Sequence, residues 1–193
     1  MERDRIVTIP NAISFLRLLG VPLFLYLFLV SDELGWAVVV LAVGGTTDWV
    51  DGFLARRLGQ VSRLGELMDP LADRLYTLAT LLAFTIGGVV PWIFTAALLA
   101  RDVVMIGCVA VVKRKGFGTL PVHYLGKAAT AQLLLAFPVL LLSAAAEGSV
   151  AAWAHAIGWG LAWWGLVFYW ISAIFYLAQA AGLIRASRRV AAA

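Results

Sequence analysis

The chain has 193 residues, of which 63% are hydrophobic and only 13% charged, and its mean hydropathy is +0.93. A soluble domain of this length needs far more polar surface, so the composition indicates a polytopic membrane protein. The formal charge of +4 does not indicate nucleic-acid binding, because the basic residues follow a membrane topology. A single cysteine, Cys108, excludes an intramolecular disulfide and a four-cysteine metal site, and we expect it to pack as a small apolar residue.

Six apolar stretches are long enough to cross a bilayer as helices, since a span needs about 20 residues. In chain order they cover about 12–31, 35–57, 68–87, 91–112, 122–146 and 155–184. The polar segments between them are short and leave no room for a separate soluble domain. We therefore expect an all-α integral membrane protein with six transmembrane helices in a single domain, 1–193.

The basic residues predict the orientation of these spans. Lys and Arg lie near both chain ends and in the second and fourth connections. In the other three connections the charged residues are all acidic: Asp32, Glu33 and Glu147. Positive residues favour the cytoplasmic side of a membrane. Both termini are therefore expected in the cytoplasm.

Four cations lie inside the apolar spans: Arg17, Arg74, Arg101 and Lys127. All but Arg101 lie within two turns of a cytoplasmic helix end, where a long side chain can extend to the interface. Arg101 is about three turns from Lys113. Neighbours on a helix point in different directions, so no ion pair is expected between Arg101 and Asp102. Arg101 instead predicts a polar cavity that extends into the bilayer from the cytoplasm.

Four aspartates are concentrated where the second span ends and the third begins. Asp48 and Asp51 are three residues apart, and Asp69 and Asp73 are four apart, so each pair shares a helix face. The connection between the spans brings the two pairs together at the cytoplasmic edge. Carboxylates so placed suit hard divalent ions that assist phosphoryl transfer. The alternative is a salt-bridge cluster with nearby arginines.

The same segment carries a family signature. In order, Asp48, Asp51-Gly52, Ala55-Arg56, Gly65, Asp69 and Asp73 follow the pattern D-x2-D-G-x2-A-R-x8-G-x3-D-x3-D. This pattern resembles that of the CDP-alcohol phosphatidyltransferases, with every fixed position matched. The resemblance extends along the whole chain and implies an active site on the cytoplasmic side between the second and third helices.

The resemblance also implies roles for these residues. Asp48, Asp51, Asp69 and Asp73 would hold two Mg²⁺ or Mn²⁺ ions, and Asp73 would act as the general base on the acceptor hydroxyl. The pocket for the cytidine diphosphate would be formed by Asp48, Gly52, Ala55, Arg56 and Gly65. For Gly52, close packing of two helices is an equally good explanation.

The acceptor is predicted from other segments. "IPNAISFLRLLGVPLFLYL" and "HYLGKAATAQLLL" resemble the branch whose acceptors are glycerol-based, and "LLARDVVMIGCVAV" resembles its cardiolipin-forming members. The preferred substrates are therefore CDP-diacylglycerol and phosphatidylglycerol, with glycerol 3-phosphate as the alternative acceptor. Arg17, Arg101 and Lys127 are the candidates for binding the acceptor phosphate.

A divalent-cation transporter is the rival from another class, but the carboxylates gather at one face and no repeat is visible. The family resemblance implies a homodimer, in which small residues such as Ala79, Ala83, Gly87 and Gly88 would permit close helix approach. The short N-terminal segment lacks an Arg- and Ser-rich transit peptide, which favours a bacterial plasma membrane.

Overall fold

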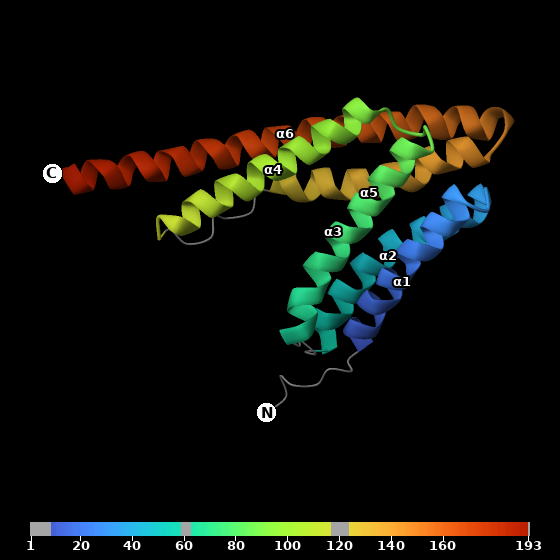
Figure 1. Ribbon diagram of the computed structural model, residues 1–193, viewed down its shortest axis with the longest axis horizontal. Coiled ribbons are helices and arrows are strands. Elements are labelled where there is room, and N and C mark those ends of the chain that lie inside the picture. The colour runs from blue at the N-terminus through green and yellow to red at the C-terminus, as the bar shows by residue number, and fades with distance from the viewer. Residues whose placement is uncertain (1–8, 59–62, 117–123, 193) are drawn as a thin grey trace. The chain divides into compact units, whose positions relative to one another are not determined.

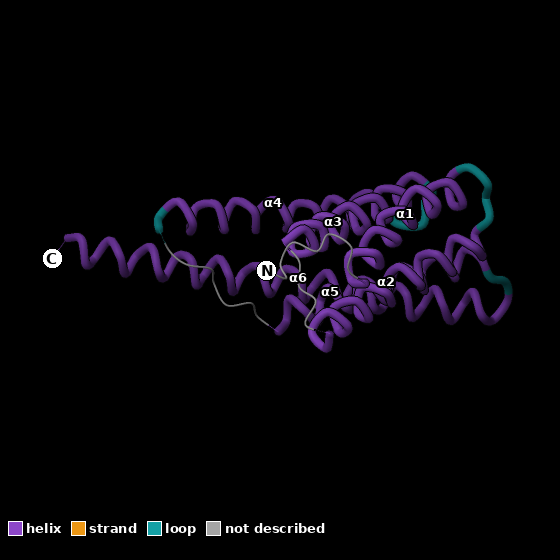
Figure 2. Tube along the Cα trace, turned by 90° about the horizontal axis from the view of Figure 1, so that it is seen from below, coloured by secondary structure: helices purple, strands orange, loops and turns teal. Residues whose placement is uncertain are grey.

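The computed structural model of the chain describes residues 9–58, 63–116 and 124–192, with side chains for 15–47, 74–116 and 124–186. The described chain forms helices joined by short loops (Figures 1 and 2). These helices are α1 (Ile9–Leu29), α2 (Leu34–Leu58), α3 (Arg63–Ile86), α4 (Trp92–Arg114), α5 (Tyr124–Ala145) and α6 (Gly148–Ala192). Each predicted span therefore corresponds to one helix, and the predicted all-α fold is confirmed.

Three of these helices are long and apolar enough to cross a membrane: α4, α5 and residues 148–186 of α6. Within the described residues, α1, α2 and α3 contribute the shorter apolar stretches Phe15–Leu29, Leu34–Thr47 and Arg74–Ile86. The chain is thus a multi-pass membrane protein. The helix α6 has 45 residues and extends beyond the predicted span at both ends. The C-terminal segment "RASRRVAA" lacks helix breakers and is rich in good helix formers, which explains the extension at that end of α6.

The chain divides into two compact units. Unit 1 comprises residues 1–91 and 135–158, and unit 2 comprises residues 92–134 and 159–193. The division passes through α5 close to Pro138, which cannot donate the backbone hydrogen bond that a helix needs at that point.

Unit 1 is built around α1, which contacts both α2 and α3 (Figure 1). Aromatic rings form its core: Phe24 stacks on Phe28 at 5.6 Å between centroids, and Phe84 meets both rings edge-on. Phe84 also meets Phe137 of α5 at 5.7 Å. These rings bury a large apolar area between the helices, and their edge-to-face geometry adds to that stabilisation.

The small residues of α3 serve this internal packing. Ala83 is buried, and a Cβ added to Gly87 would come within 2.8 Å of two carbons of the Phe28 ring. Close helix approach at these two residues therefore occurs within the chain, between α1 and α3. The homodimer stays a prediction.

The end of α3 is a Schellman motif. Gly88 has φ +73°, and its N–H bonds the carbonyl of Thr85, while the N–H of Val89 bonds the carbonyl of Phe84 at 2.9 Å. Glycine takes this left-handed conformation without a Cβ clash, so it ends the helix and leads the chain toward α4.

Unit 2 contains α4, the first part of α5 and most of α6. Phe94 meets the rings of Trp159 and Trp163 edge-on at 5.9 and 5.5 Å. Further along the same two helices, Cys108, Val112 and Ala180 form a small buried cluster. Cys108 is 8% exposed, which confirms its expected role as a small apolar packing residue.

Candidate active site

Tyr76 sets the register between α2 and α3. Its hydroxyl donates a hydrogen bond of 2.7 Å to the carbonyl of Leu41. A Cβ added to Gly44 would come within 2.8 Å of the Tyr76 ring and hydroxyl, so this glycine lets the ring lie directly against α2. Because the two helices run in opposite directions, positions late in α2 lie level with positions early in α3.

The four aspartates lie at two heights along the paired helices α2 and α3, measured from the contact between Gly44 and Tyr76. Asp51 lies seven residues beyond Gly44, and Asp69 lies seven residues before Tyr76. Asp48 lies four residues beyond Gly44, and Asp73 lies three residues before Tyr76. Seven residues correspond to two helical turns, about 10 Å along the axis. The backbone therefore carries both pairs to the same end of α2 and α3.

The side chains of the signature lie outside the described residues. Asp48, Asp51, Gly52, Ala55 and Arg56 belong to α2, and Gly65, Asp69 and Asp73 belong to α3. Their roles as metal ligands, general base and diphosphate pocket stay predictions. Among the side chains that the structure does describe, no three of His, Cys, Asp and Glu gather as a metal site would require.

The hydroxyls just before the first aspartate serve their own helix. Thr46 donates to the carbonyl of Ala42 at 2.7 Å, and Thr47 donates to that of Val43 at 2.9 Å. Such back-bonding satisfies a hydroxyl in an apolar setting. In the segment "TTD", the two threonine hydroxyls are therefore accounted for by bonds within α2, and only Asp48 remains as a candidate for binding a ligand.

Arg101 lies in a closed network with Asp102 and Tyr169 in unit 2. Its Nη1 donates to Asp102 Oδ1 at 3.1 Å, and its Nε donates to the backbone carbonyl of Tyr169 at 3.3 Å. The guanidinium carbon lies 3.6 Å from the centre of the Tyr169 ring, and the Tyr169 hydroxyl donates to the same Asp102 oxygen at 2.8 Å. The network neutralises a buried cation by ion pairing, hydrogen bonding and cation–π contact at once.

The expectation that Arg101 and Asp102 do not pair was wrong. Although helical neighbours diverge, the Arg101 side chain is long enough to turn back, and Tyr169 holds both groups from the facing helix α6. The side chains of Arg101 and Asp102 are only 8% and 22% exposed. Sequence reasoning missed Tyr169 because it lies 67 residues from Asp102 within an aromatic stretch, where no spacing marks one tyrosine.

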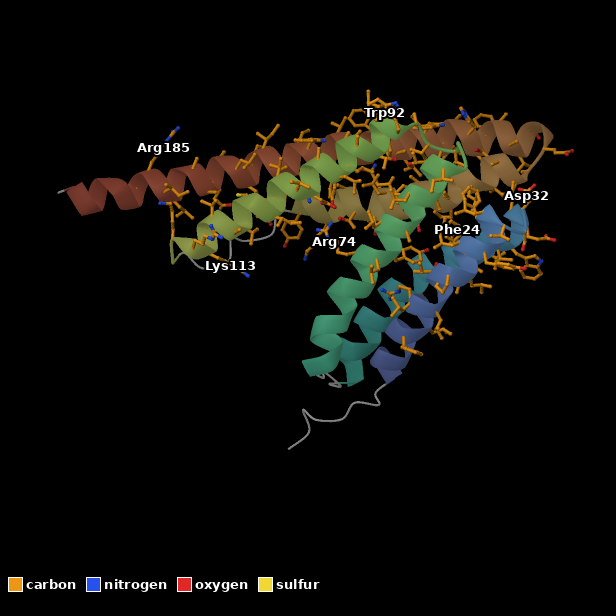
Figure 3. The ribbon with its side chains drawn as sticks, viewed as in Figure 1. Phe24, Asp32, Arg74, Trp92, Lys113 and Arg185 are labelled. Atoms are coloured by element: carbon orange, nitrogen blue, oxygen red, sulfur yellow. The ribbon has the colours of Figure 1, made fainter. Side chains whose placement is uncertain are left out.

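The other intramembrane cations differ in exposure. Arg17 is buried in α1 of unit 1, whereas Arg74 and Lys127 are exposed. Arg74 lies on α3 (Figure 3), and in the sequence it directly follows Asp73. The ammonium of Lys127 lies 6.0 Å from the centre of the Tyr124 ring, one turn earlier on α5. Lys127 is therefore accessible to an anion.

Charge is divided unequally between the units. Unit 1 holds ten of the eleven acidic residues and seven basic ones, a formal charge of −3. Unit 2 holds eight basic residues and a single acid, a formal charge of +7, and that acid is Asp102. A site built from several carboxylates can therefore form only in unit 1, while unit 2 is suited to anions.

Comparison with known proteins agrees with the signature. The family model for CDP-alcohol phosphatidyltransferase matches residues 7–178. The chain is 45% identical over 191 residues to the CMP-forming cardiolipin synthase of Streptomyces coelicolor, a match that covers 96% of this chain and 88% of the relative. It is 38% identical over 188 residues, with the same shares, to a provisionally named cardiolipin synthase of Mycobacterium tuberculosis.

A third relative has a different name. The CDP-diacylglycerol–glycerol-3-phosphate 3-phosphatidyltransferase of Aquifex aeolicus is 40% identical over 113 residues, which cover 56% of this chain and 62% of that protein. The family model spans most of the chain, including α2 and α3, which carry the signature. This chain is an enzyme of the CDP-alcohol phosphatidyltransferase family.

Proposed function

We propose that the chain is a CMP-forming cardiolipin synthase, which transfers the phosphatidyl group of CDP-diacylglycerol to phosphatidylglycerol. The observation that carries this proposal is the 45% identity, over nearly the whole chain, to the Streptomyces coelicolor enzyme of that name. The segment "LLARDVVMIGCVAV", which contains Arg101 and Asp102 and resembles that of the cardiolipin-forming members, gives further support.

The reaction exchanges one phosphoester oxygen for another. The oxygen of the primary headgroup hydroxyl of phosphatidylglycerol bonds to the phosphorus that carries diacylglycerol, and the bond from that phosphorus to the CMP oxygen breaks. CMP leaves with the electron pair, and the carboxylate of Asp73 accepts the hydroxyl proton. Asp48, Gly52, Ala55, Arg56 and Gly65 form the cytidine diphosphate pocket, in which Arg56 balances the phosphate charge.

The donor set in unit 1 fits divalent metal ions. Asp48, Asp51, Asp69 and Asp73 supply oxygen ligands at two levels of the α2–α3 register, as hard cations prefer. Two Mg²⁺ or Mn²⁺ ions held there would neutralise the diphosphate and the charge that develops on the leaving CMP. A pure salt-bridge cluster fits less well, because unit 1 holds three more acids than bases.

The acceptor phosphate is assigned to basic residues. Lys127 is exposed and accessible, so it is the principal candidate. The Nε and Nη1 groups of Arg101 already donate hydrogen bonds to Tyr169 and Asp102, so Arg101 has fewer donors left for the acceptor phosphate. Arg17 is buried in unit 1 and is the third candidate.

In the membrane, we propose that all six helices form a single domain with six spans and with both termini in the cytoplasm. The helices have 21 to 45 residues, so each reaches the length that a span needs. The one-sided distribution of Lys and Arg supports a cytoplasmic position for the ends of α2 and α3 that carry the aspartates. The N-terminal segment without an Arg- and Ser-rich pattern favours a bacterial plasma membrane. The family resemblance adds a homodimer to this proposal.

One specific observation favours a second function, synthesis of phosphatidylglycerophosphate from glycerol 3-phosphate. It is the 40% identity to the Aquifex aeolicus relative, although that match covers little more than half of the chain. Both functions use the same donor, metals and base, and they differ only in the acceptor.

Product identification separates the two functions. The purified protein receives Mg²⁺, CDP-diacylglycerol and either phosphatidylglycerol or glycerol 3-phosphate, and mass spectrometry identifies the lipid formed. We expect cardiolipin from phosphatidylglycerol and no product from glycerol 3-phosphate. Phosphatidylglycerophosphate as the sole product would refute the first function and establish the second.

A further inference from the structure

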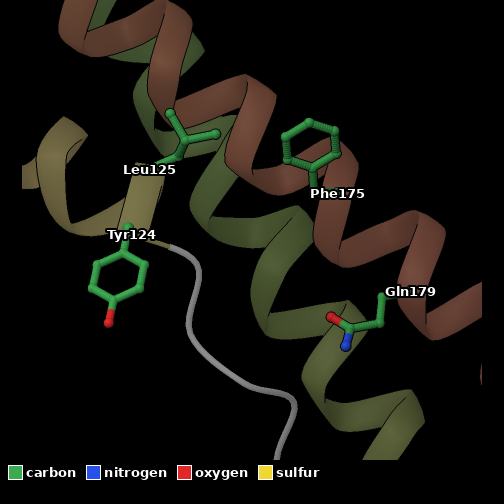
Figure 4. Close-up of a pocket in the computed structure, with 4 residues that line it drawn as sticks. All are labelled: Tyr124, Leu125, Phe175 and Gln179. Carbon is green, nitrogen blue, oxygen red and sulfur yellow. The ribbon is translucent and has the colours of Figure 1, made fainter.

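Unit 2 contains an open groove of about 580 Å³ at the start of α5. It is lined by Tyr124 and Leu125 of α5 and by Phe175 and Gln179 of α6 (Figure 4). Tyr124 is 88% exposed and Phe175 is 46% exposed, so two aromatic rings are accessible from outside the groove. The volume lies within the range of small-molecule sites, and three of the four lining side chains are largely apolar.

The groove lies where the described part of the seam between α5 and α6 ends. A Cβ on Gly165 would lie 3.0 Å from Leu133, and a Cβ on Gly126 would lie 3.0 Å from the Ser172 hydroxyl. These contacts are seven residues apart on each helix, which is the repeat of tightly packed helix pairs. The next step along α6 is Gln179, which lines the groove together with Tyr124 and Leu125 of the first turn of α5.

Gln179 brings an unused hydrogen-bonding group to this groove. Its Oε1 is buried, yet it accepts no hydrogen bond from any described residue. A buried amide oxygen without a partner costs free energy, so such a group commonly marks the place of a ligand or a water molecule. A glutamine amide both donates and accepts, and it can therefore pair with a hydroxyl or with an ester oxygen.

The chemistry changes in order along α6. Phe175 is apolar, Gln179 one turn later is polar, and Arg185 a further six residues on is charged and exposed. The ten residues from Phe175 to Arg185 span about 15 Å. Phe175 and Gln179 are four residues apart and share a face of α6, so the groove combines an apolar and a hydrogen-bonding side chain, as the acyl chain and the glycerol esters of a phospholipid require. Arg185 is turned about 120° away from Gln179 around the helix and does not line the groove.

Further cations surround the same end of unit 2. Lys113 and Arg185 are exposed and lie at the same end of α4 and α6 (Figure 3). Lys127 adds its ammonium beside the Tyr124 ring. The only acid of unit 2 is already paired with Arg101. The charge around the groove therefore favours an anionic headgroup.

We propose that this groove binds the acceptor lipid, phosphatidylglycerol, with an acyl chain against Phe175 and Leu125 and with Gln179 hydrogen-bonded to its polar region. This inference rests on the proposed function. The donor is assigned by the signature to unit 1, whereas the groove belongs to unit 2, where no second carboxylate is available to hold a metal. Gln179 is thus a specificity-determining residue for the acceptor.

Gln179→Leu tests the proposal, and Gln132→Leu is its matched control. Gln132 of α5 also has a buried Oε1 that accepts no hydrogen bond from any described residue, but it does not line the groove. Neither change removes a hydrogen bond to Oε1 that the described structure shows, so we expect neither to lower the melting temperature. At saturating CDP-diacylglycerol, we expect Gln179→Leu to raise the KM for phosphatidylglycerol about three- to tenfold. The KM for CDP-diacylglycerol should stay within about twofold, and Gln132→Leu should change neither constant.

Crosslinking gives a readout that does not depend on turnover. Phosphatidylglycerol with a diazirine on one acyl chain is irradiated with the protein in detergent, and labelled peptides are mapped by mass spectrometry. We expect labels on the first turn of α5 and around residue 175 of α6, displaced by unlabelled phosphatidylglycerol more effectively than by phosphatidic acid or CDP-diacylglycerol. Labels confined to α1–α3, or equal effects of the two glutamine variants, would overturn the proposal. Labelling of the groove by a protein that makes no cardiolipin would keep the groove and refute the proposed function.

Discussion

The two units of this enzyme differ in charge more than in fold. Both are bundles of apolar helices with aromatic cores, but unit 1 carries −3 and nearly all the carboxylates, whereas unit 2 carries +7 with one carboxylate. A membrane protein retains intramembrane charge mainly where function or pairing requires it. This difference fits the division of labour that we propose, in which unit 1 would bind metals and the donor diphosphate and unit 2 would bind the anionic acceptor.

Removal of divalent metal should affect unit 1 alone and should have the largest effect. Chelation with EDTA is expected to abolish turnover, and added Mg²⁺ or Mn²⁺ should restore it, because four clustered carboxylates repel the diphosphate when no metal is bound. Crosslinking of phosphatidylglycerol to the groove of unit 2 should persist under chelation. Full activity after exhaustive chelation would contradict the metal assignment.

Substitution of the general base comes next. Asp73→Asn should lower kcat about 100- to 10,000-fold, since the amide cannot accept the hydroxyl proton. Glu66→Gln is the matched control, because Glu66 is a carboxylate on the same helix α3 but outside the signature. The control should retain activity within about threefold if the carboxylate positions act individually. Equal losses in the two variants would show that charge near α3 matters in general and would remove the assignment of Asp73.

Within unit 2, the Arg101 network should matter for stability. Asp102→Asn leaves a buried guanidinium without its counter-charge, and we expect a loss of about 3 kcal/mol, or roughly 6–12 °C in Tm. Tyr169→Phe removes one hydrogen bond while keeping the ring over Arg101, and it should cost only about 1 kcal/mol. Thermal unfolding in detergent measures both. A larger effect of Tyr169→Phe than of Asp102→Asn would contradict the network.

A comparably small effect is expected at the contact that sets the register in unit 1. Gly44→Ala should cost about 1–3 kcal/mol and lower kcat, because the new methyl group pushes Tyr76 away from α2 and shifts the aspartates out of register. Gly45→Ala is the control, since a Cβ there meets nothing within 4 Å in the described structure. Thermal unfolding and kcat are compared for the pair, and equal behaviour would show that the register does not depend on Tyr76.

Much of the fold could be predicted from the sequence because apolar length and breaks mark membrane helices directly. Each of the six predicted segments matches a helix to within a few residues at most ends. The exception is α6, whose Ala- and Arg-rich end continues as helix beyond the apolar stretch, where hydropathy no longer reports helix formation.

The parts of the site that could not be predicted depend on contacts between distant residues. The aspartates were recognisable because their spacing along the chain is itself the signal. Tyr76 and Tyr169 were not, since their partners lie 35 and 67 residues away and nothing local distinguishes them. An ion pair between Arg101 and Asp102 was not expected, because neighbouring residues of a helix point in different directions. That argument did not include Tyr169 on the facing helix, which contacts both side chains.

The division of labour is tested most directly by measuring both Michaelis constants in one variant from each unit. Arg56→Ala of unit 1 should raise the KM for CDP-diacylglycerol about tenfold or more and leave that for phosphatidylglycerol unchanged. Lys127→Gln of unit 2 should do the reverse, and Lys127→Arg should recover most of the loss because it keeps the charge. If Lys127→Gln raised the KM for CDP-diacylglycerol instead, the two units would share the donor, and the division of labour between them would be refuted.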